Sequence, residues 1–151
     1  MGISMALQKR GKWWYGESQA DIRGEITRYS KLVGYDADHF ADAVCKTCSG
    51  ALFTLLLDDT EGVAVRSCVC GEKAHPIGDS TDFMEEAEVS QCSCPCGQEL
   101  FEITVGISLY DGSDDVRWLY VGCRCPGCGL TAVYGDWKNE FCGFRELLDR
   151  I

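Results

Sequence analysis

Two cysteine-bounded stretches decide the fold: CKTCSGALFTLLLDDTEGVAVRSCVCG at residues 45–71 and CPCGQELFEITVGISLYDGSDDVRWLYVGCRCPGCG at residues 94–129. Each begins and ends with a close pair of cysteines, and each has a phenylalanine five residues after the second cysteine, at Phe53 and Phe101. Between its cysteine pairs, each stretch has two apolar runs around an acidic turn with glycine, which predicts a β-hairpin. This shared order of features indicates an internal duplication.

The cysteine spacing predicts one metal site in each repeat. Two close pairs, brought together by the hairpin between them, can direct four sulfurs at one ion, and a glycine after a pair permits the positive φ that such a turn needs. Tetrahedral zinc accepts four thiolates, although iron accepts the same set. The predicted ligands are Cys45, Cys48, Cys68 and Cys70 in the first site and Cys94, Cys96, Cys125 and Cys128 in the second.

Three further cysteines lie outside these sets. Cys92 and Cys123 are alternatives for a ligand of the second site, because the pair Cys94 and Cys96 is separated by one residue and not by the commoner two. Otherwise we interpret both of them, and Cys142, as packed or incidental thiols. Arg124 is a neighbour that could favour the thiolate of Cys123.

The cysteine turns joined by a hairpin resemble those of zinc ribbons, from roughly residue 45 to residue 136. The resemblance implies two zinc-ribbon units that hold two structural Zn²⁺ ions. With the helices expected at both ends of the chain, the fold class is α+β. Zinc ribbons serve many functions, so the resemblance indicates the fold and not the activity.

Helical patterns flank the repeats. Residues 18–33 have apolar side chains at helical spacing, with Ser18 as the expected N-cap and Gly34 as the expected C-cap. We expect a second short helix over residues 36–44, a helical turn around Phe83 and Met84, and a closing helix over residues 141–151. The apolar residues of the first and last helices are Ile22, Ile26, Tyr29, Val33, Phe144, Leu147, Leu148 and Ile151.

These patterns divide the chain into four regions. We expect a basic and aromatic lead with helices over residues 1–44, the first zinc ribbon over 45–82, an acidic connector over 83–91, and the second zinc ribbon with the closing helix over 92–151. No stretch approaches the roughly 18 apolar residues that cross a bilayer, and the first sixteen residues lack the sustained apolar core and small-residue cleavage site of an export signal. The 11 cysteines are odd in number and grouped in pairs. We therefore predict a cytoplasmic protein whose thiols bind metal and do not form disulfides.

Charge favours a basic partner. Residues 1–33 have a formal charge of +3 and the remainder has −13. Eight thiolates and two Zn²⁺ would take the whole chain from −10 to about −14. This predicts a noncatalytic protein-interaction module, with an acidic inhibitor or immunity-type protein as an analogy from composition alone. Nonspecific attraction to nucleic acid is disfavoured by the same charge.

Nucleic-acid binding is the alternative function. Trp13, Trp14 and Tyr15 could stack on bases, anchor a partner or close over the core, and we expect a mixture of these roles. The candidate cationic patch contains Lys9, Arg10, Lys12, Arg23, Arg28 and Lys31.

Catalysis is the least favoured function. The chain has only two histidines, His39 and His75, which is too few for a histidine-rich catalytic zinc site. His75, Asp79 and Asp136 are weak candidates for acid and base groups, and we interpret them as turn residues. The acidic turns at residues 58–61 and 111–115 lack calcium-loop spacing and are predicted to be solvated hairpin tips.

Overall fold

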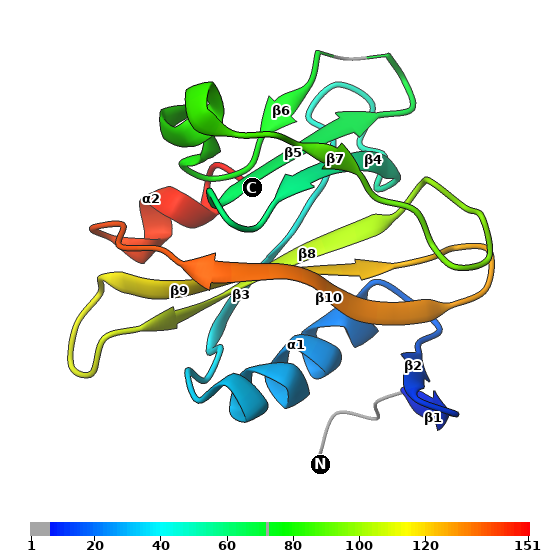
Figure 1. The fold of residues 1–151 in the computed structure, drawn as a ribbon, viewed down its shortest axis with the longest axis horizontal. Helices are drawn as coiled ribbons and strands as arrows, with labels where there is room; N and C mark the ends of the chain where they lie inside the picture. The colour runs from blue at the N-terminus through cyan, green and yellow to red at the C-terminus, as the bar shows by residue number, and fades with distance from the viewer. Residues whose placement is uncertain (1–6, 72) are drawn as a thin grey trace.

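The computed structural model describes residues 7–71 and 73–151, so part of the N-terminal lead, where an export signal would begin, lies outside the described residues. The fold is α+β, as predicted. Figure 1 shows two sheets stacked above the long helix α1 (Ala20–Val33), with the short helix α2 (Phe144–Leu148) at one side. Within the described residues, no helix is long and apolar enough to cross a membrane.

The larger sheet has six strands in the order β1-β2-β10-β9-β8-β3, and its neighbouring strands are antiparallel. It contains the predicted second hairpin, β8 and β9, with β10 and β3 on its two sides. The strands are β1 (Gln8–Arg10), β2 (Trp13–Tyr15), β3 (His39–Asp42), β8 (Glu102–Leu109), β9 (Val116–Arg124) and β10 (Leu130–Lys138).

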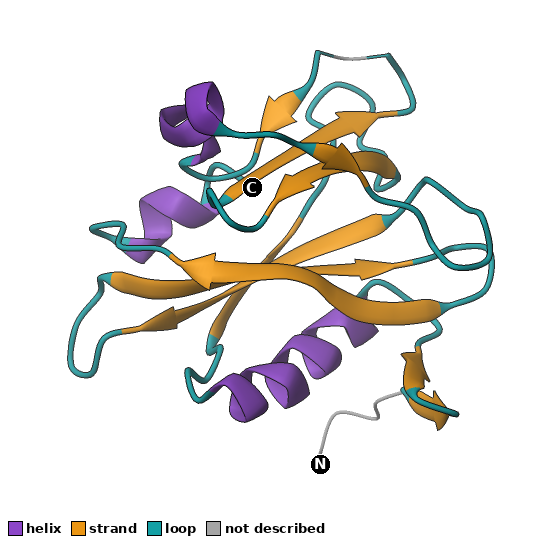
Figure 2. Cartoon of the chain, viewed as in Figure 1, coloured by secondary structure: helices purple, strands orange, loops and turns teal. Residues whose placement is uncertain are grey.

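The smaller sheet has four antiparallel strands in the order β6-β5-β4-β7. Its centre is the predicted first hairpin, and the helical turn predicted in the acidic connector is the 3-10 helix η1 (Ser80–Glu86). Figure 2 shows η1 and α2 beside this sheet. The strands are β4 (Phe53–Asp58), β5 (Val63–Cys68), β6 (His75–Pro76) and β7 (Ser90–Gln91).

The helix predicted over residues 36–44 is wrong, because this segment contains strand β3. Its backbone pairs with β8, from His39 opposite Ile107 to Asp42 opposite Thr104. Alternate side chains point to opposite faces of a strand: Ala41 packs against the core between the sheets, whereas Phe40 packs on the side of α1. Pairing with an available sheet edge outweighs a weak local helical pattern.

Helix α1 begins later than predicted and without the predicted Ser18 cap. Its N-cap residue is Gln19, which makes no side-chain capping bond. Instead, the buried carboxylate of Asp21 accepts hydrogen bonds from the backbone N–H groups of Glu17 and Ser18, at 2.8 and 3.1 Å. The C-cap prediction is confirmed, because Gly34 ends the helix in the left-handed region with φ 99°.

Two apolar cores lie on opposite faces of the six-stranded sheet. The main core fills the space between the sheets and includes Phe53, Leu55, Phe101, Ile103 and Val121. The smaller core lies under α1 and contains Ile22, Ile26, Ala37 and Tyr120. The helix lies close to β9 because residue 122 is glycine: a Cβ there would be 2.5 Å from Cγ2 of Ile22.

The two phenylalanines matched in the repeat pair with each other. The N–H of Phe53 donates to the carbonyl of Phe101 at 2.9 Å, and the N–H of Phe101 donates to the carbonyl of Phe53 at 2.8 Å. Both side chains are fully buried. The two repeats therefore join through equivalent residues, each of which follows the first cysteine pair of its repeat.

Candidate metal centres

The eight predicted ligands come together as two separate groups, each at the open end of one hairpin. Within each group, the four sulfur atoms lie within 4.8 Å of one another. Each group has two buried and two exposed cysteines. The groups are Cys45, Cys48, Cys68 and Cys70, which we call the first cluster, and Cys94, Cys96, Cys125 and Cys128, which we call the second cluster.

The sulfur spacing suits a tetrahedral ion. Four sulfurs about 2.3 Å from one ion would be about 3.8 Å from one another. In the first cluster, Cys45 Sγ lies 3.8 Å from Cys70 Sγ and Cys48 Sγ lies 3.4 Å from Cys68 Sγ. In the second cluster, the corresponding distances are 3.5 Å for Cys94 and Cys128 and 3.6 Å for Cys96 and Cys125. Both groups can hold a metal ion.

Two of the four turns share one backbone arrangement. In the turn from Cys45, the N–H of Cys45 bonds to the carbonyl of Gly50, and the N–H of Ser49 bonds to the carbonyl of Cys45, both at 2.8 Å. The turn from Cys125 has the same two bonds, to Leu130 at 2.9 Å and from Gly129 at 2.8 Å. The turns with two intervening residues are therefore built alike, although one opens its repeat and the other closes it.

In all four turns, the residue directly after the second cysteine has a left-handed backbone conformation. These residues are Ser49, Gly71, Gly97 and Gly129, with φ of 62°, 87°, 99° and 84°. Glycine adopts this conformation without steric cost, whereas serine does not. The three glycines are a sign of this conformation in the sequence, whereas Ser49 gives no such sign.

Backbone N–H groups point at the sulfurs, as expected around thiolate ligands. The N–H of Gly50 donates to Cys48 Sγ at 3.3 Å. The N–H of Cys70 lowers the pKa of the Cys68 thiol to about 7, and the N–H of Gln98 does the same for Cys96. Burial raises the pKa of Cys94. In each cluster a backbone N–H thus favours the thiolate form of one ligand, and a bound cation would favour ionisation of the whole group.

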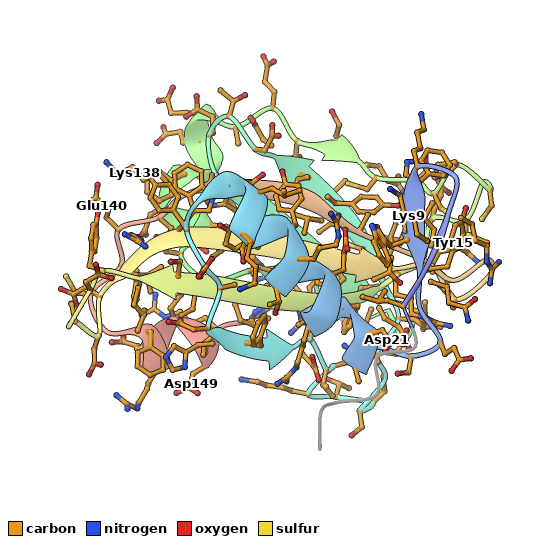
Figure 3. The ribbon with its side chains drawn as sticks, turned by 90° about the horizontal axis from the view of Figure 1, so that it is seen from below. Lys9, Tyr15, Asp21, Lys138, Glu140 and Asp149 are labelled. Atoms are coloured by element: carbon orange, nitrogen blue, oxygen red, sulfur yellow. The ribbon has the colours of Figure 1, made fainter. Side chains whose placement is uncertain are left out.

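The second cluster is connected to the N-terminal lead, which the sequence did not reveal. The N–H of Gly16 donates to the carbonyl of Gly129 at 2.8 Å, and Arg124 Nε donates to the carbonyl of Gly16 at 2.9 Å. Strand β2 also pairs with the start of β10. In Figure 3, Lys9 and Tyr15 of the β1–β2 hairpin lie near Asp21, at the end of the sheet opposite Lys138 and Glu140.

The remaining cysteines lie outside both groups. Cys123 is completely buried in the main core, and burial raises the pKa of its thiol far above the usual value. The Arg124 guanidinium pairs with Glu102 at 2.8 Å. The hypothesis that Arg124 favours a thiolate at Cys123 is therefore wrong. Cys92 is half-buried and packs against the same core, whereas Cys142 is exposed.

The weak acid and base candidates have separate partners and do not form one site. The His75 ring contacts the carbonyl of Arg150 at 2.7 Å. Asp79 accepts a hydrogen bond from the Asn139 amide at 2.9 Å, and burial raises its pKa. Asp136 accepts from the Tyr29 hydroxyl and the Trp118 indole.

Comparison of the chain with protein-family models, with curated proteins and with solved structures found no match.

Proposed function

We propose that this chain is a noncatalytic protein with two zinc-ribbon units, and that its two structural zinc ions support a surface that binds a basic protein. The observation that carries the proposal is the closure of each hairpin by four cysteine sulfurs within 4.8 Å of one another. Four thiolates complete a tetrahedral zinc site and leave no position for a substrate water. Such a site stabilises a fold that is otherwise divided between two small sheets.

The partners of the acid and base candidates support a structural role for those residues. His75 and Asp79 hold the end of the chain and the start of η1, through Arg150 and Asn139. Asp136 joins α1 to the sheet through Tyr29 and Trp118. These contacts give each candidate residue a role in joining parts of the fold, as expected for a noncatalytic protein.

Charge supports a basic protein as the partner. The chain has a formal charge of −10, and two occupied zinc sites would make it about −14. Two of the six candidate nucleic-acid contacts are engaged within the chain: Arg23 lies 3.3 Å from Asp42, and Arg28 lies 2.8 Å from Glu25. An acidic protein attracts a basic partner over long range and accelerates its association.

Single-stranded nucleic acid is the second candidate, because of the β1–β2 hairpin. Trp13 is 39% exposed, with the Lys12 ammonium 5.0 Å from its ring, and Arg10 lies 4.9 Å from the ring of Tyr15. Exposed aromatic rings beside cations are the usual contacts of sequence-independent single-strand binding. The hairpin offers few cations, however, on a strongly acidic molecule.

The test begins with the metal and continues with the partner. Elemental analysis of the untagged protein, with thiol titration before and after chelation, is expected to give two zinc ions per chain and eight protected thiols. The zinc-loaded chain is then used to capture proteins from an extract of its source organism, and each captured protein is purified and titrated. We expect to capture a basic protein whose affinity for this chain falls as salt is added. Metal-free protein with oxidised cysteines would overturn the metal assignment, and salt-dependent binding to single-stranded RNA or DNA without a protein partner would favour the second candidate.

A further inference from the structure

Three large apolar side chains are exposed within seven residues of the acidic connector, 83–89. Phe83 is 44% exposed, Met84 is 40% exposed and Val89 is 38% exposed. They lie on or just after η1, which Figure 1 shows (green, beside β6) on the side of the molecule away from α1. Exposed apolar side chains that gather in one place commonly mark an interaction surface.

This segment is anchored at both ends. At its start, the buried hydroxyl of Ser80 accepts a hydrogen bond from the N–H of Ala64 in β5, at 3.0 Å. At its end, the N–H of Glu88 donates to Oδ2 of Asp58, the last residue of β4, at 2.8 Å, and β7 then pairs with β4. Because these bonds fix the segment to the first hairpin, its apolar side chains are held in place before any partner binds.

The same surface has a high density of negative charge. No lysine or arginine occurs between Lys73 and Arg117. Among the described residues, none of the carboxylates in this segment or in the adjoining turn forms an ion pair with a lysine or arginine. We name η1, residues 87–89 and the turn at 58–61 the acidic platform; its carboxylates are Asp58, Asp59, Glu61, Asp82, Glu85, Glu86 and Glu88.

We propose that the acidic platform is the docking surface for the basic partner, and that it binds a lysine- or arginine-rich segment that also presents apolar side chains. This inference rests on the proposed function. Burial of Phe83 and Met84 supplies apolar contact area, and the surrounding carboxylates select a cationic partner and orient it.

The β8–β9 turn is the competing acidic surface, and it is less suitable. It lines an open hollow of about 480 Å³ with Asp38, Tyr110, Asp111 and Asp114. Asp114 already pairs with Arg145 at 3.3 Å. Tyr110 is the one large exposed apolar residue of this turn in the described chain. The negative charge of the β8–β9 turn is thus partly compensated, and this turn exposes fewer large apolar side chains than the acidic platform does.

The test uses two synthetic lysine-rich peptides of equal length and charge, titrated into the zinc-loaded, isotope-labelled full chain. One peptide has Leu and Trp between its lysines, and the other has Ser at those positions. Binding is followed by NMR chemical shifts and calorimetry. The Leu/Trp peptide is expected to bind at least about tenfold more tightly, with shifts concentrated at residues 58–61 and 80–89.

Matched variants separate the two acidic surfaces. Phe83→Ser and Glu86→Lys are each expected to weaken the Leu/Trp peptide about tenfold. Leu32→Ser, at a 76% exposed position on α1, should leave the affinity unchanged, and Asp111→Lys, which reverses one charge as Glu86→Lys does, should weaken the peptide much less than tenfold. Zinc content and thermal unfolding of every variant show that it is folded.

Each contrary outcome has a distinct meaning. If Asp111→Lys weakens the peptide and Phe83→Ser does not, the platform is wrong while a basic partner for the protein stands. Equal affinity for the two peptides overturns the apolar contact and therefore the platform. If neither peptide binds at low salt, the proposed basic partner is contradicted as well.

Discussion

The first cluster closes its hairpin at the surface, whereas the second cluster closes its hairpin against the N-terminal lead. A Cβ on Gly71, in the last turn of the first cluster, would meet nothing within 4 Å. A Cβ on Gly129, in the last turn of the second, would lie 3.0 Å from the carbonyl oxygen of Gly16. Two sites with the same donor atoms are therefore coupled to different amounts of structure, and the second supports the β1–β2 hairpin and the start of α1.

The largest expected effect comes from removing one ligand of each cluster at matched turns. Cys45→Ser and Cys125→Ser should each reduce the zinc content from two ions to one. A structural zinc site contributes on the order of 10 kcal/mol to folding, so each variant should lose several kcal/mol. Cys125→Ser should lose more, because its turn also holds β2. Elemental analysis and denaturant unfolding, followed by tryptophan fluorescence, measure both quantities.

The location of the damage separates the two variants further. Hydrogen exchange in Cys125→Ser should accelerate in β1, β2 and the first turn of α1, whereas exchange in Cys45→Ser should accelerate mainly in β4 and β5. If Cys45→Ser unfolds the N-terminal hairpin as readily as Cys125→Ser does, the difference in coupling is wrong.

The next effect concerns the residues through which the repeats join. Phe53→Ala and Phe101→Ala should each cost about 3–5 kcal/mol, because both rings are fully buried. The two losses should be similar, since each ring lies in the same core beside another planar group: the Arg66 guanidinium is 4.6 Å from the ring of Phe53, and the Tyr134 ring is 5.1 Å from that of Phe101. Urea unfolding of both variants provides the comparison, and a difference above about 2 kcal/mol would show that the joint is unequal.

A smaller effect is expected where α1 packs on the sheet that contains the second hairpin. Gly122→Ala should cost about 1–3 kcal/mol by overpacking, because its Cβ would lie 2.5 Å from Ile22 Cγ2. The double variant Gly122→Ala with Ile22→Ala removes the closest of these contacts and leaves those to Ile26 at 2.9 Å, so its loss should be smaller than the sum of the single losses. Additive losses in a double-mutant cycle would contradict this cause.

The sequence predicted the parts of the fold that local patterns control. Both hairpins and the α1 pattern are visible in apolar periodicity and turn residues, and the close cysteine pairs predicted the two groups of four. Strand β3 and the β1–β2 hairpin were not predicted, because their conformation depends on backbone groups of β8 and β10 that are distant in sequence. The support of the second cluster by Gly16 and Arg124 has the same origin: neither residue carries a local signal for a contact across more than a hundred positions.

The smallest effects concern the left-handed residue that follows each cysteine pair. Ser49→Gly should stabilise the zinc-loaded protein slightly, by up to about 1 kcal/mol, because φ at this residue is 62° and glycine adopts that conformation more readily. The reverse change at Gly71 should cost about 1 kcal/mol through φ alone, since a Cβ there meets no other atom within 4 Å.

Gly129→Ser should cost more than Gly71→Ser, because its Cβ would also press on the carbonyl of Gly16, the group through which the lead is held. Denaturant unfolding of the three variants at saturating zinc measures these costs, and the excess at Gly129 over Gly71 reports how firmly the second cluster is packed against the lead. Equal costs at the two glycines would mean that the β1–β2 hairpin can move away from residue 129 with no cost in the free energy of unfolding. The second cluster would then support no more structure than the first.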